Sequence, residues 1–377
     1  DYRDIINDPE ISLVVVLTGN NDVAYEIITE CFKKSKHVVT ANKALLALKW
    51  KEIFNVAREN NCLIYFEASA ASGVPLIQGI NEGMAANSIR SIKGILNGTT
   101  NYVLTKMSRD CQDFEEAMAD AVKAGFAEPD SSADIEGYDA AYKICVLANI
   151  IFDYPVDFED VYVEGIKDIE LEDIEYAKEL FGLNLKLLAV VKRRGEKAEI
   201  RVHPALLPEE DMLAGVSYEN NGVLVDGNYS GPVMFYGRGA GKFPAASAVV
   251  SDIIYLAQKI NYNIAGRVPY VNTDTSGTMP VQDIDGLEFQ YYVRFTTEDC
   301  PGVLSKISGI LGENGVSIAS CFQKGRASGK EVPIIMVTHF AGEGDLKKAL
   351  KKIDALDITK AKSIYLRIES DKAQEIE

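Results

Sequence analysis

Strands and helices alternate over the first part of the chain, and this order restricts the possible folds more than any other feature. Short apolar runs at 11–17, 37–40 and 62–66 predict strands, and the segments 22–34 and 42–60 between them predict helices. Strands that alternate with helices in this way form βαβ units and a parallel sheet. We therefore predict an α/β protein whose first unit is a parallel sheet.

The phosphate-binding signature of a dinucleotide-binding sheet is missing from this first unit. No Gly-x-Gly-x-x-Gly precedes the predicted strands, and the chain opens on the polar stretch DYRDIINDPE. That signature normally fills the first strand-to-helix turn of a Rossmann fold. We therefore expect an incomplete Rossmann-like sheet whose first βαβ unit would lie upstream of Asp1. Without that unit, affinity for a dinucleotide would be impaired.

The middle of the chain mixes helices and strands, which is typical of an α+β domain. The predicted helices lie at 74–84, 98–107, 114–124, 134–152 and about 244–260, and the predicted strands at 88–96, 185–191, 198–203 and 223–236.

From Phe289 onward the predicted order is strand, helix, strand, strand, helix, strand, which is the ferredoxin-like order. A stretch rich in Thr, Ser, Gly and Asp comes before it and reads as a linker. The predicted division is 1–65 with helix 244–264 packing back on it, then 66–241, a linker at 266–287, and 288–377.

Charge and composition exclude several classes of protein. Lys plus Arg total 39 against 56 for Asp plus Glu, so the net charge is −17 and a nucleic acid would be repelled. The apolar runs are far shorter than the ~20 residues of a membrane-spanning helix. The 6 cysteines form no Cys-x-x-Cys pair and the 3 histidines are far apart, which suggests neither a zinc cluster nor a disulfide framework. We expect a cytoplasmic protein.

Lys143 is the single charge in the apolar segment 140–152, which follows a loop with several carboxylates. A helix that is hydrophobic all round is a buried one, and Asp139 lies one turn earlier on the same face. Burial lowers a lysine pKa and a nearby carboxylate raises it, so such a site can set the proton affinity that acid–base chemistry requires. A structural ion pair inside a core is the alternative interpretation.

Lys43 is likewise the only charge in its segment, 38–48, at the point where a predicted strand turns into a helix. Open α/β sheets bind ligands at the carboxyl ends of their strands. We therefore predict that Lys43 and Lys143 face one cleft. A solvated lysine in the first turn of a helix is the alternative interpretation of Lys43.

The glycine-rich segment GRGAG, 237–241, lies between a predicted strand and a predicted helix. Glycines let the backbone approach a ligand, and a helix N-terminus with Lys242 beside it favours an anion. A plain tight turn is the alternative.

Taken together, several motifs resemble the homoserine dehydrogenase family. They are TANKALLA from Thr40, FEASAASGVPLI from Phe66, GILNGTTNYVLTKM from Gly94, FAEPDSSADIEGYDAAYK from Phe126, and the GRGAG loop. The final unit, with DCPGVL from Asp299 and ENGVSIAS from Glu313, is similar to an ACT domain. These motifs follow the family's order and span nearly the whole chain.

The resemblance implies an NAD- or NADP-dependent enzyme that interconverts L-aspartate 4-semialdehyde and L-homoserine in threonine, methionine and isoleucine biosynthesis. It implies that Glu128 binds the substrate amino group, that Asp134 and Asp139 are the acidic pair of the same loop, and that Lys143 donates the proton. It also implies that Lys43 lies near the nicotinamide and the substrate.

Further positions follow from the same resemblance. Thr18, Gly19, Lys43, Gly239 and Gly241 match positions that contact the cofactor. A monovalent cation, sodium or potassium, would be held by four backbone carbonyls, and oxygen-only coordination suits such a hard cation. The four residues are Glu67, Ala70, Ser72 and Val74.

The ACT resemblance implies feedback by an end product such as L-threonine, with Asp299 and Asn314 as effector positions. A helix cap at Asp299 and a helix stop at Asn314 are the alternatives. Because ACT units commonly pair edge to edge, we expect a homo-oligomer.

Two other functions stay open from the sequence. A non-catalytic amino-acid sensor derived from the enzyme would explain the missing glycine signature. A dehydrogenase of another amino acid is the third possibility, but the acidic loop and the TANK segment match the family together.

Overall fold

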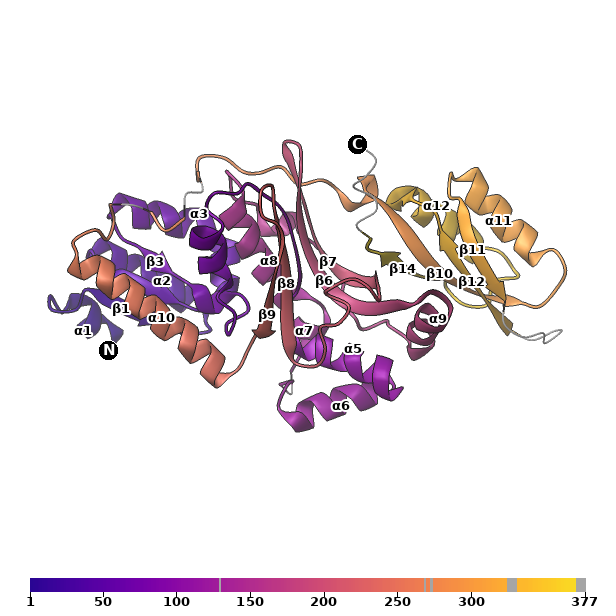
Figure 1. The fold of residues 1–377 in the computed structure, drawn as a ribbon, viewed down its shortest axis with the longest axis horizontal. Helices are drawn as coiled ribbons and strands as arrows, with labels where there is room; N and C mark the ends of the chain where they lie inside the picture. Colours follow the sequence, from indigo (N-terminus) through magenta and orange to yellow (C-terminus); the bar gives the residue numbers. More distant parts are fainter. Residues whose placement is uncertain (129, 268, 272–273, 324–330, 371–377) are drawn as a thin grey trace.

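The computed structural model describes residues 1–370 except 129, 268, 272–273 and 324–330. Its parts follow one another along the molecule, with a small parallel sheet at one end, a mixed sheet in the middle and a smaller sheet with two helices at the other end (Figure 1). The predicted α/β class is confirmed. No helix within the described residues has both the length and the apolar character needed to cross a membrane.

The first sheet has three parallel strands in the order β1-β2-β3. The strands are β1 (Leu13–Val16), β2 (His37–Thr40) and β3 (Ile64–Tyr65), and the helices of this part are α1 (Tyr2–Asn7), α2 (Asn21–Lys33) and α3 (Lys43–Glu59). Helix α10 (Lys242–Asn261), from much later in the chain, packs against β1 and β2 (Figure 1). The predicted parallel sheet is therefore confirmed.

Asparagine caps fix where the helices of this sheet begin. The side chains of Asn20 and Asn42 accept hydrogen bonds from the backbone N–H groups of Val23 (3.1 Å) and Leu45 (3.0 Å). Such caps satisfy N–H groups that have no partner inside the helix. Asn42 also donates to the carbonyl of Thr18 at 3.2 Å, so the carboxyl ends of β1 and β2 are held side by side.

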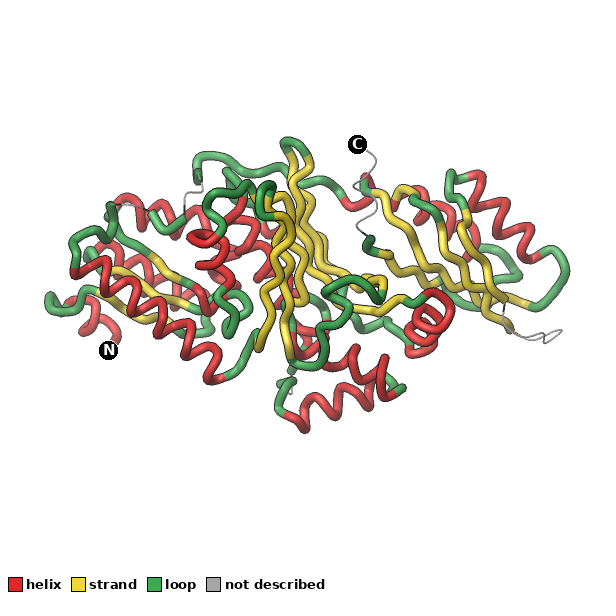
Figure 2. Tube along the Cα trace, viewed as in Figure 1, coloured by secondary structure: helices red, strands yellow, loops and turns green. Residues whose placement is uncertain are grey.

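The middle sheet is antiparallel along the order β7-β6-β4-β8-β9, while β5 pairs in parallel with β7, and helices cover the sheet (Figure 2). Its strands are β4 (Ile89–Ile95), β5 (Tyr162–Val163), β6 (Leu183–Arg194), β7 (Lys197–Pro208), β8 (Asn220–Gly227) and β9 (Gly231–Arg238). Its helices are α4 (Leu76–Gln78), α5 (Gly98–Asp110), α6 (Phe114–Ala124), α7 (Ser132–Ile135), α8 (Tyr138–Ile151) and α9 (Leu171–Phe181).

Several predicted elements of this part were wrong in extent. The helix predicted at 134–152 is two helices, α7 and α8, because Gly137 has a φ of +87°, which suits glycine best. The strand predicted at 223–236 is the hairpin of β8 and β9. The helix predicted at 74–84 is the short α4 followed by a wide turn at 79–83, and α9 was not predicted.

The last unit has the predicted ferredoxin-like order, with strands arranged β11-β12-β10-β14. Its elements are β10 (Glu288–Glu298), α11 (Val303–Glu313), β11 (Ile318–Gln323), β12 (Glu331–Thr338), β13 (Ala341–Gly342), α12 (Glu343–Asp354) and β14 (Ile364–Ile368). This unit has a hydrophobic core of its own.

The sheets of the middle and last units are continuous. Strand β14 pairs in parallel with β7 at Arg367 with Ala205 and at Ile368 with Leu206, so both units share one 11-stranded sheet. The sequence pattern did not predict this seam, because a pairing of two residues on each side leaves no local signal.

Candidate active site

A cavity of about 810 Å³ lies where the first and middle parts of the molecule meet. Six parts of the chain line it: the start of α3, the turn after β4, the loop with Gly125–Glu128 and Asp130–Asp134, the first turns of α8, Glu219 just before β8, and the GRGAG loop with the start of α10. Lys43 and Lys143 both line this cavity, as the sequence predicted.

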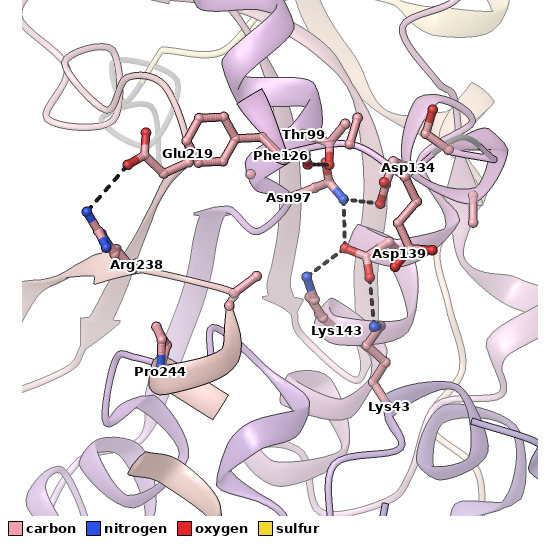
Figure 3. A pocket seen from close by; sticks show the side chains of 18 of the residues that line it. Lys43, Asn97, Thr99, Phe126, Asp134, Asp139, Lys143, Glu219, Arg238 and Pro244 are labelled. Atoms are coloured by element: carbon pink, nitrogen blue, oxygen red, sulfur yellow. Dashed lines mark hydrogen bonds and ion pairs between the residues drawn. The ribbon is translucent and has the colours of Figure 1, made fainter. Parts of the chain in front are cut away.

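The carboxylate of Asp139 joins the two lysines (Figure 3). Its Oδ2 lies 2.6 Å from Nζ of Lys143, and its Oδ1 lies 3.1 Å from Nζ of Lys43. The i,i+4 spacing on α8 brings Asp139 and Lys143 together, as expected. Lys43 reaches the same carboxylate from the first turn of α3.

The two lysines differ in their exposure to solvent. The side chain of Lys143 is 10% exposed and that of Lys43 is 39% exposed. Nζ of Lys143 also donates to the carbonyl of Leu96 at 2.7 Å. An ammonium group has three N–H donors. With two of them directed at Asp139 and Leu96, a third is left for a molecule in the cavity.

Asn97 organises the acidic side of the cavity, and the sequence reasoning did not single it out. Its Nδ2 donates to Asp134 at 2.6 Å and to Asp139 at 2.8 Å (Figure 3). Its Oδ1 accepts from the backbone N–H of Thr100 at 2.8 Å and so caps α5. An asparagine between a predicted strand and Gly-Thr-Thr is a helix-cap signal, which could have identified it.

These contacts set the charge of the two acids. Burial on its own would raise the pKa of Asp139, but the charges of Lys143 and Lys43 and the hydrogen bonds hold that pKa below its usual range. Burial, followed by the charge of Asp139, raises the pKa of Asp134. Asp139 is therefore the fixed anion of the cluster.

Glu128 lines the cavity from the exposed loop between α6 and α7, as does Asp130. Glu219 and Arg238 also line the cavity and lie 3.9 Å apart (Figure 3). The sequence reasoning missed this pair, because an ion pair between the ends of two strands has no local pattern. The cavity thus carries charges of both signs.

The positions expected to contact the cofactor are not all at this cavity. Gly241 lines it, caps α10 and has a φ of +119°. Gly239 is not part of the lining, and a Cβ there would come within 2.0 Å of Asn221, so the backbone is closely packed at this position. Thr18 and Gly19 lie at the carboxyl end of β1, outside the cavity lining.

The surroundings of these residues fit a dinucleotide. A Cβ added at Gly19 would meet no atom within 4 Å, so the space beside the backbone is open there. The N-terminus of α10, with Lys242, lines the cavity and offers backbone N–H groups to an anion.

The segment expected to hold a cation is a buried turn beside α10. The backbone N–H of Glu67 donates to Asp252 at 2.8 Å, and the Glu67 carboxylate accepts from Ile77 and Gln78 at 2.9 Å each. Burial raises the pKa of both acids, that of Asp252 to about 7. Among the described residues, Oδ1 of Asp252 is buried without a partner, so this turn suits a cation.

The four carbonyl-bearing residues lie along this turn. Glu67 is in the 3₁₀ turn 67–69, Ala70 follows it, and Ser72 donates its N–H to Gly239 at 2.9 Å. The carbonyl of Val74 accepts from Leu76 at 2.7 Å, and a carbonyl oxygen has a second lone pair for a cation.

The two predicted effector residues are not brought together. Asp299 precedes the first turn of α11, and Asn314 is the residue that ends it. An 11-residue helix is ~16 Å long, so the two cannot touch one small molecule in a single chain. Asn314 also accepts from Lys352 at 3.0 Å, in keeping with the helix-stop alternative.

Comparison with protein families gives three matches along the chain. Residues 1–67 match the model described as homoserine dehydrogenase, NAD binding domain. Residues 75–254 match homoserine dehydrogenase, and residues 291–357 match the ACT domain.

Individual relatives carry the same name. The homoserine dehydrogenase of Pseudomonas aeruginosa is 38% identical over 98% of this chain and 86% of its own length, and that of Synechocystis is 40% identical over the same shares. A crystal structure of a homoserine dehydrogenase from Thiobacillus denitrificans is 38% identical with a TM-score of 0.93, covering 98% of this chain and 85% of that one. A hyperthermophilic archaeal homoserine dehydrogenase in complex with NADPH has a TM-score of 0.60 and is 28% identical, covering 69% of this chain and 75% of that one.

Proposed function

The chain belongs to the homoserine dehydrogenase family, and we propose that its cavity interconverts L-aspartate 4-semialdehyde and L-homoserine with Lys143 as the proton donor. The observation that supports this assignment is the shared carboxylate, Asp139, which holds both lysines at one cavity. The alternative of a non-catalytic sensor finds no support among the relatives.

The reaction requires a group that stabilises negative charge on the oxygen of the aldehyde. When bound, a nicotinamide cofactor supplies the hydride to the aldehyde carbon. The carbonyl oxygen gains negative charge as the alcohol forms, so a proton donor or a cation must stand beside it. Lys143 holds the proton at Nζ, with Asp139 and Leu96 fixing the direction of the ammonium group.

Lys43 and Asp139 support the donor in different ways. Lys43 adds a second positive charge beside the reacting oxygen. Asp139 holds both amines in place through its two carboxylate oxygens. Because Lys43 is partly in water, its electrostatic effect is weaker than that of Lys143.

The substrate also has an ammonium and a carboxylate group. Glu128, at the exposed edge of the cavity, is the partner for the ammonium, and Asp134, held by Asn97, is a second acid on that side. Under this proposal residues 66–241 bind the substrate. Residues 1–65, with helix 244–264, bind the cofactor through Thr18, Gly19, Lys43 and the loop that contains Gly239 and Gly241.

A monovalent cation at the turn formed by Glu67, Ala70, Ser72 and Val74 belongs to the same proposal. The buried acids Glu67 and Asp252 make that turn favourable for a positive charge. We expect the melting temperature to rise when sodium or potassium chloride replaces tetramethylammonium chloride at equal ionic strength. Equal melting temperatures would count against the site.

The ACT domain gives the chain a place for an amino-acid effector, and we propose L-threonine. Because Asp299 and Asn314 lie at opposite ends of α11, only a second copy of the chain could bring one of each together, which agrees with a homo-oligomer. Titration of L-threonine into wild type and Asp299→Ala checks the assignment. Unchanged binding would remove Asp299 from the effector site.

The function is tested by mixing the protein with L-aspartate 4-semialdehyde and following the loss of NADPH absorbance. We expect consumption of NADPH that depends on the semialdehyde, with L-homoserine as the product. The same assay with NADH measures the cofactor preference. Absence of turnover by a protein that binds NADPH would contradict the proposal.

A further inference from the structure

The end of the last strand places an acid in a buried socket of the middle sheet. Glu369 follows β14, and its carboxylate lies 2.6 Å from Nζ of Lys192, 2.7 Å from Nη2 of Arg201 and 3.5 Å from Nζ of Lys93. Glu369 is 3% exposed, and its backbone N–H donates to Leu206 at 2.9 Å. We call Lys93, Lys192 and Arg201 the cationic socket.

The socket is not neutral without Glu369. Its other buried acid, Glu199, lies 2.8 Å from Arg201 and 2.9 Å from the half-exposed Arg194. Burial would raise the pKa of Glu369, but Arg201, Lys192 and Lys93 hold it well below its usual range. Removing this carboxylate would leave uncompensated positive charge inside the protein, which is strongly unfavourable.

One residue of the socket belongs to the strand that leads to the active site. Lys93 lies on β4, where it pairs with Val190 of β6 and Leu224 of β8. Three residues later, the carbonyl of Leu96 accepts from Lys143, and the next residue, Asn97, holds the two acids. A shift of β4 along its axis therefore moves both supports of the donor.

We propose that Glu369 is a positioning residue for catalysis: by holding Lys93, it fixes the register of β4 and hence the Leu96 carbonyl and the Asn97 amide that orient Lys143. The inference rests on the function proposed above and deepens it. Under this proposal the ACT domain helps to support the active site. A displacement of β14 would therefore change the position of the proton donor.

A second buried ion cluster between the same units offers a matched control. Nε of Arg294, on β10, lies 2.6 Å from Asp173 of α9, and the hydroxyl of Tyr292 donates to Asp173 at 2.9 Å. Asp173 is 1% exposed, as buried as Glu369. Since this cluster contains no residue of β4, Asp173→Asn removes a buried acid from the contact between the units without touching the route to Leu96.

The test compares Glu369→Gln with Asp173→Asn in the full chain. We expect Glu369→Gln to lower kcat ~10-fold or more while KM for the semialdehyde changes less than ~3-fold, because misplacing a catalytic group costs turnover more than binding. Asp173→Asn should keep kcat within ~2-fold, since the donor keeps its supports. Glu369→Asp, which keeps the charge, should recover part of the loss.

Hydrogen exchange supplies a readout that needs no turnover. The amides of 93–97 should exchange faster in Glu369→Gln and at the wild-type rate in Asp173→Asn. If Glu369→Gln does not fold, Lys93→Gln takes its place, because Lys192 and Arg201 still hold Glu369, and the same losses are expected.

Wild-type exchange and kcat in a folded Glu369→Gln or Lys93→Gln protein would overturn the inference. Equal losses in Asp173→Asn would overturn it too, because they would reflect general docking of the two units. Failure of the wild type to reduce the semialdehyde counts against the proposed function instead, and the exchange comparison still decides the positioning role.

Discussion

Two clusters of buried charge in this molecule have similar components and different surroundings. At the cavity, Asp139 holds Lys43 and Lys143, and at the cationic socket Glu369 holds Lys93, Lys192 and Arg201. The socket is closed, and the amines at the cavity line about 810 Å³ of open space. A carboxylate that is enclosed among cations has a structural role. A carboxylate takes part in the chemistry when a lysine that it holds still has an N–H donor facing a ligand.

Loss of the donor at the cavity should have the largest effect on turnover. We expect Lys143→Ala to keep the fold and to lower kcat by ~10² or more, because the proposed proton donor to the developing alkoxide is lost. Steady-state NADPH oxidation and a thermal melt provide the two measurements. Turnover close to that of the wild type would remove Lys143 as the donor.

Asn97 tests whether the acids at the cavity need to be held together. Asn97→Ser keeps a side chain that can cap α5 but loses the amide that bridges Asp134 and Asp139. We expect kcat to fall ~10-fold with little change in melting temperature, because the direction of Asp139 is relaxed. Asn97→Asp, which adds a third carboxylate, serves as the comparison. If both variants match the wild type in kcat, the bridge has no catalytic role.

Lys43 should matter less than Lys143, because water screens its charge. We expect Lys43→Met to lower kcat ~3- to 10-fold and to weaken NADPH binding. Fluorescence titration with NADPH separates the two effects. A loss in kcat as large as that of Lys143→Ala would mean that the two lysines contribute equally to turnover, despite their different exposure to water.

Substitution of Lys186 tests whether the burial of a lysine or its position at the cavity determines its effect on turnover, because Lys186 is buried but lies outside the cavity lining. Burial, with the charge of Arg109, lowers its pKa to about 8, and its Nζ donates to the carbonyl of Val216 at 2.5 Å. Lys186→Met should leave kcat within ~2-fold, since this amine does not face the substrate. A large loss of kcat would mean that burial of a lysine, and not its place at the cavity, decides the effect.

The same variant should change how stability depends on pH. Between pH 8 and about 10.4 the unfolded chain keeps the proton on Lys186 while the folded protein has lost it, so stability gains from rising pH. Across that window the wild type should gain on the order of 3 kcal/mol relative to Lys186→Met. Urea unfolding of both proteins at the two ends of the window measures the difference. A constant difference would contradict the lowered pKa.

The comparison also shows which parts of the molecule the sequence could predict. The pairing of Asp139 with Lys143 follows from an i,i+4 spacing in an apolar helix, and Lys43 follows from the position of strand ends in a parallel sheet. Both are local rules. Asn97 follows from one further local rule, the helix cap.

The remaining features depend on contacts between distant segments. The packing of Gly239 against Asn221, the pair of Glu219 with Arg238, and the socket around Glu369 each join separate strands. Such contacts are set by sheet order and register, which no short stretch of sequence determines. The break between α7 and α8 at Gly137 could be predicted only in part, because a glycine in a helical pattern favours a break but does not require one.

The most direct test of the central claim is a single-turnover measurement of hydride transfer. The protein is first saturated with NADPH and then mixed with L-aspartate 4-semialdehyde, using wild type, Lys143→Ala and Lys186→Met. The account predicts equal NADPH binding in all three proteins, with hydride transfer slowed ~10²-fold or more only in Lys143→Ala. Equal rates in wild type and Lys143→Ala would contradict it.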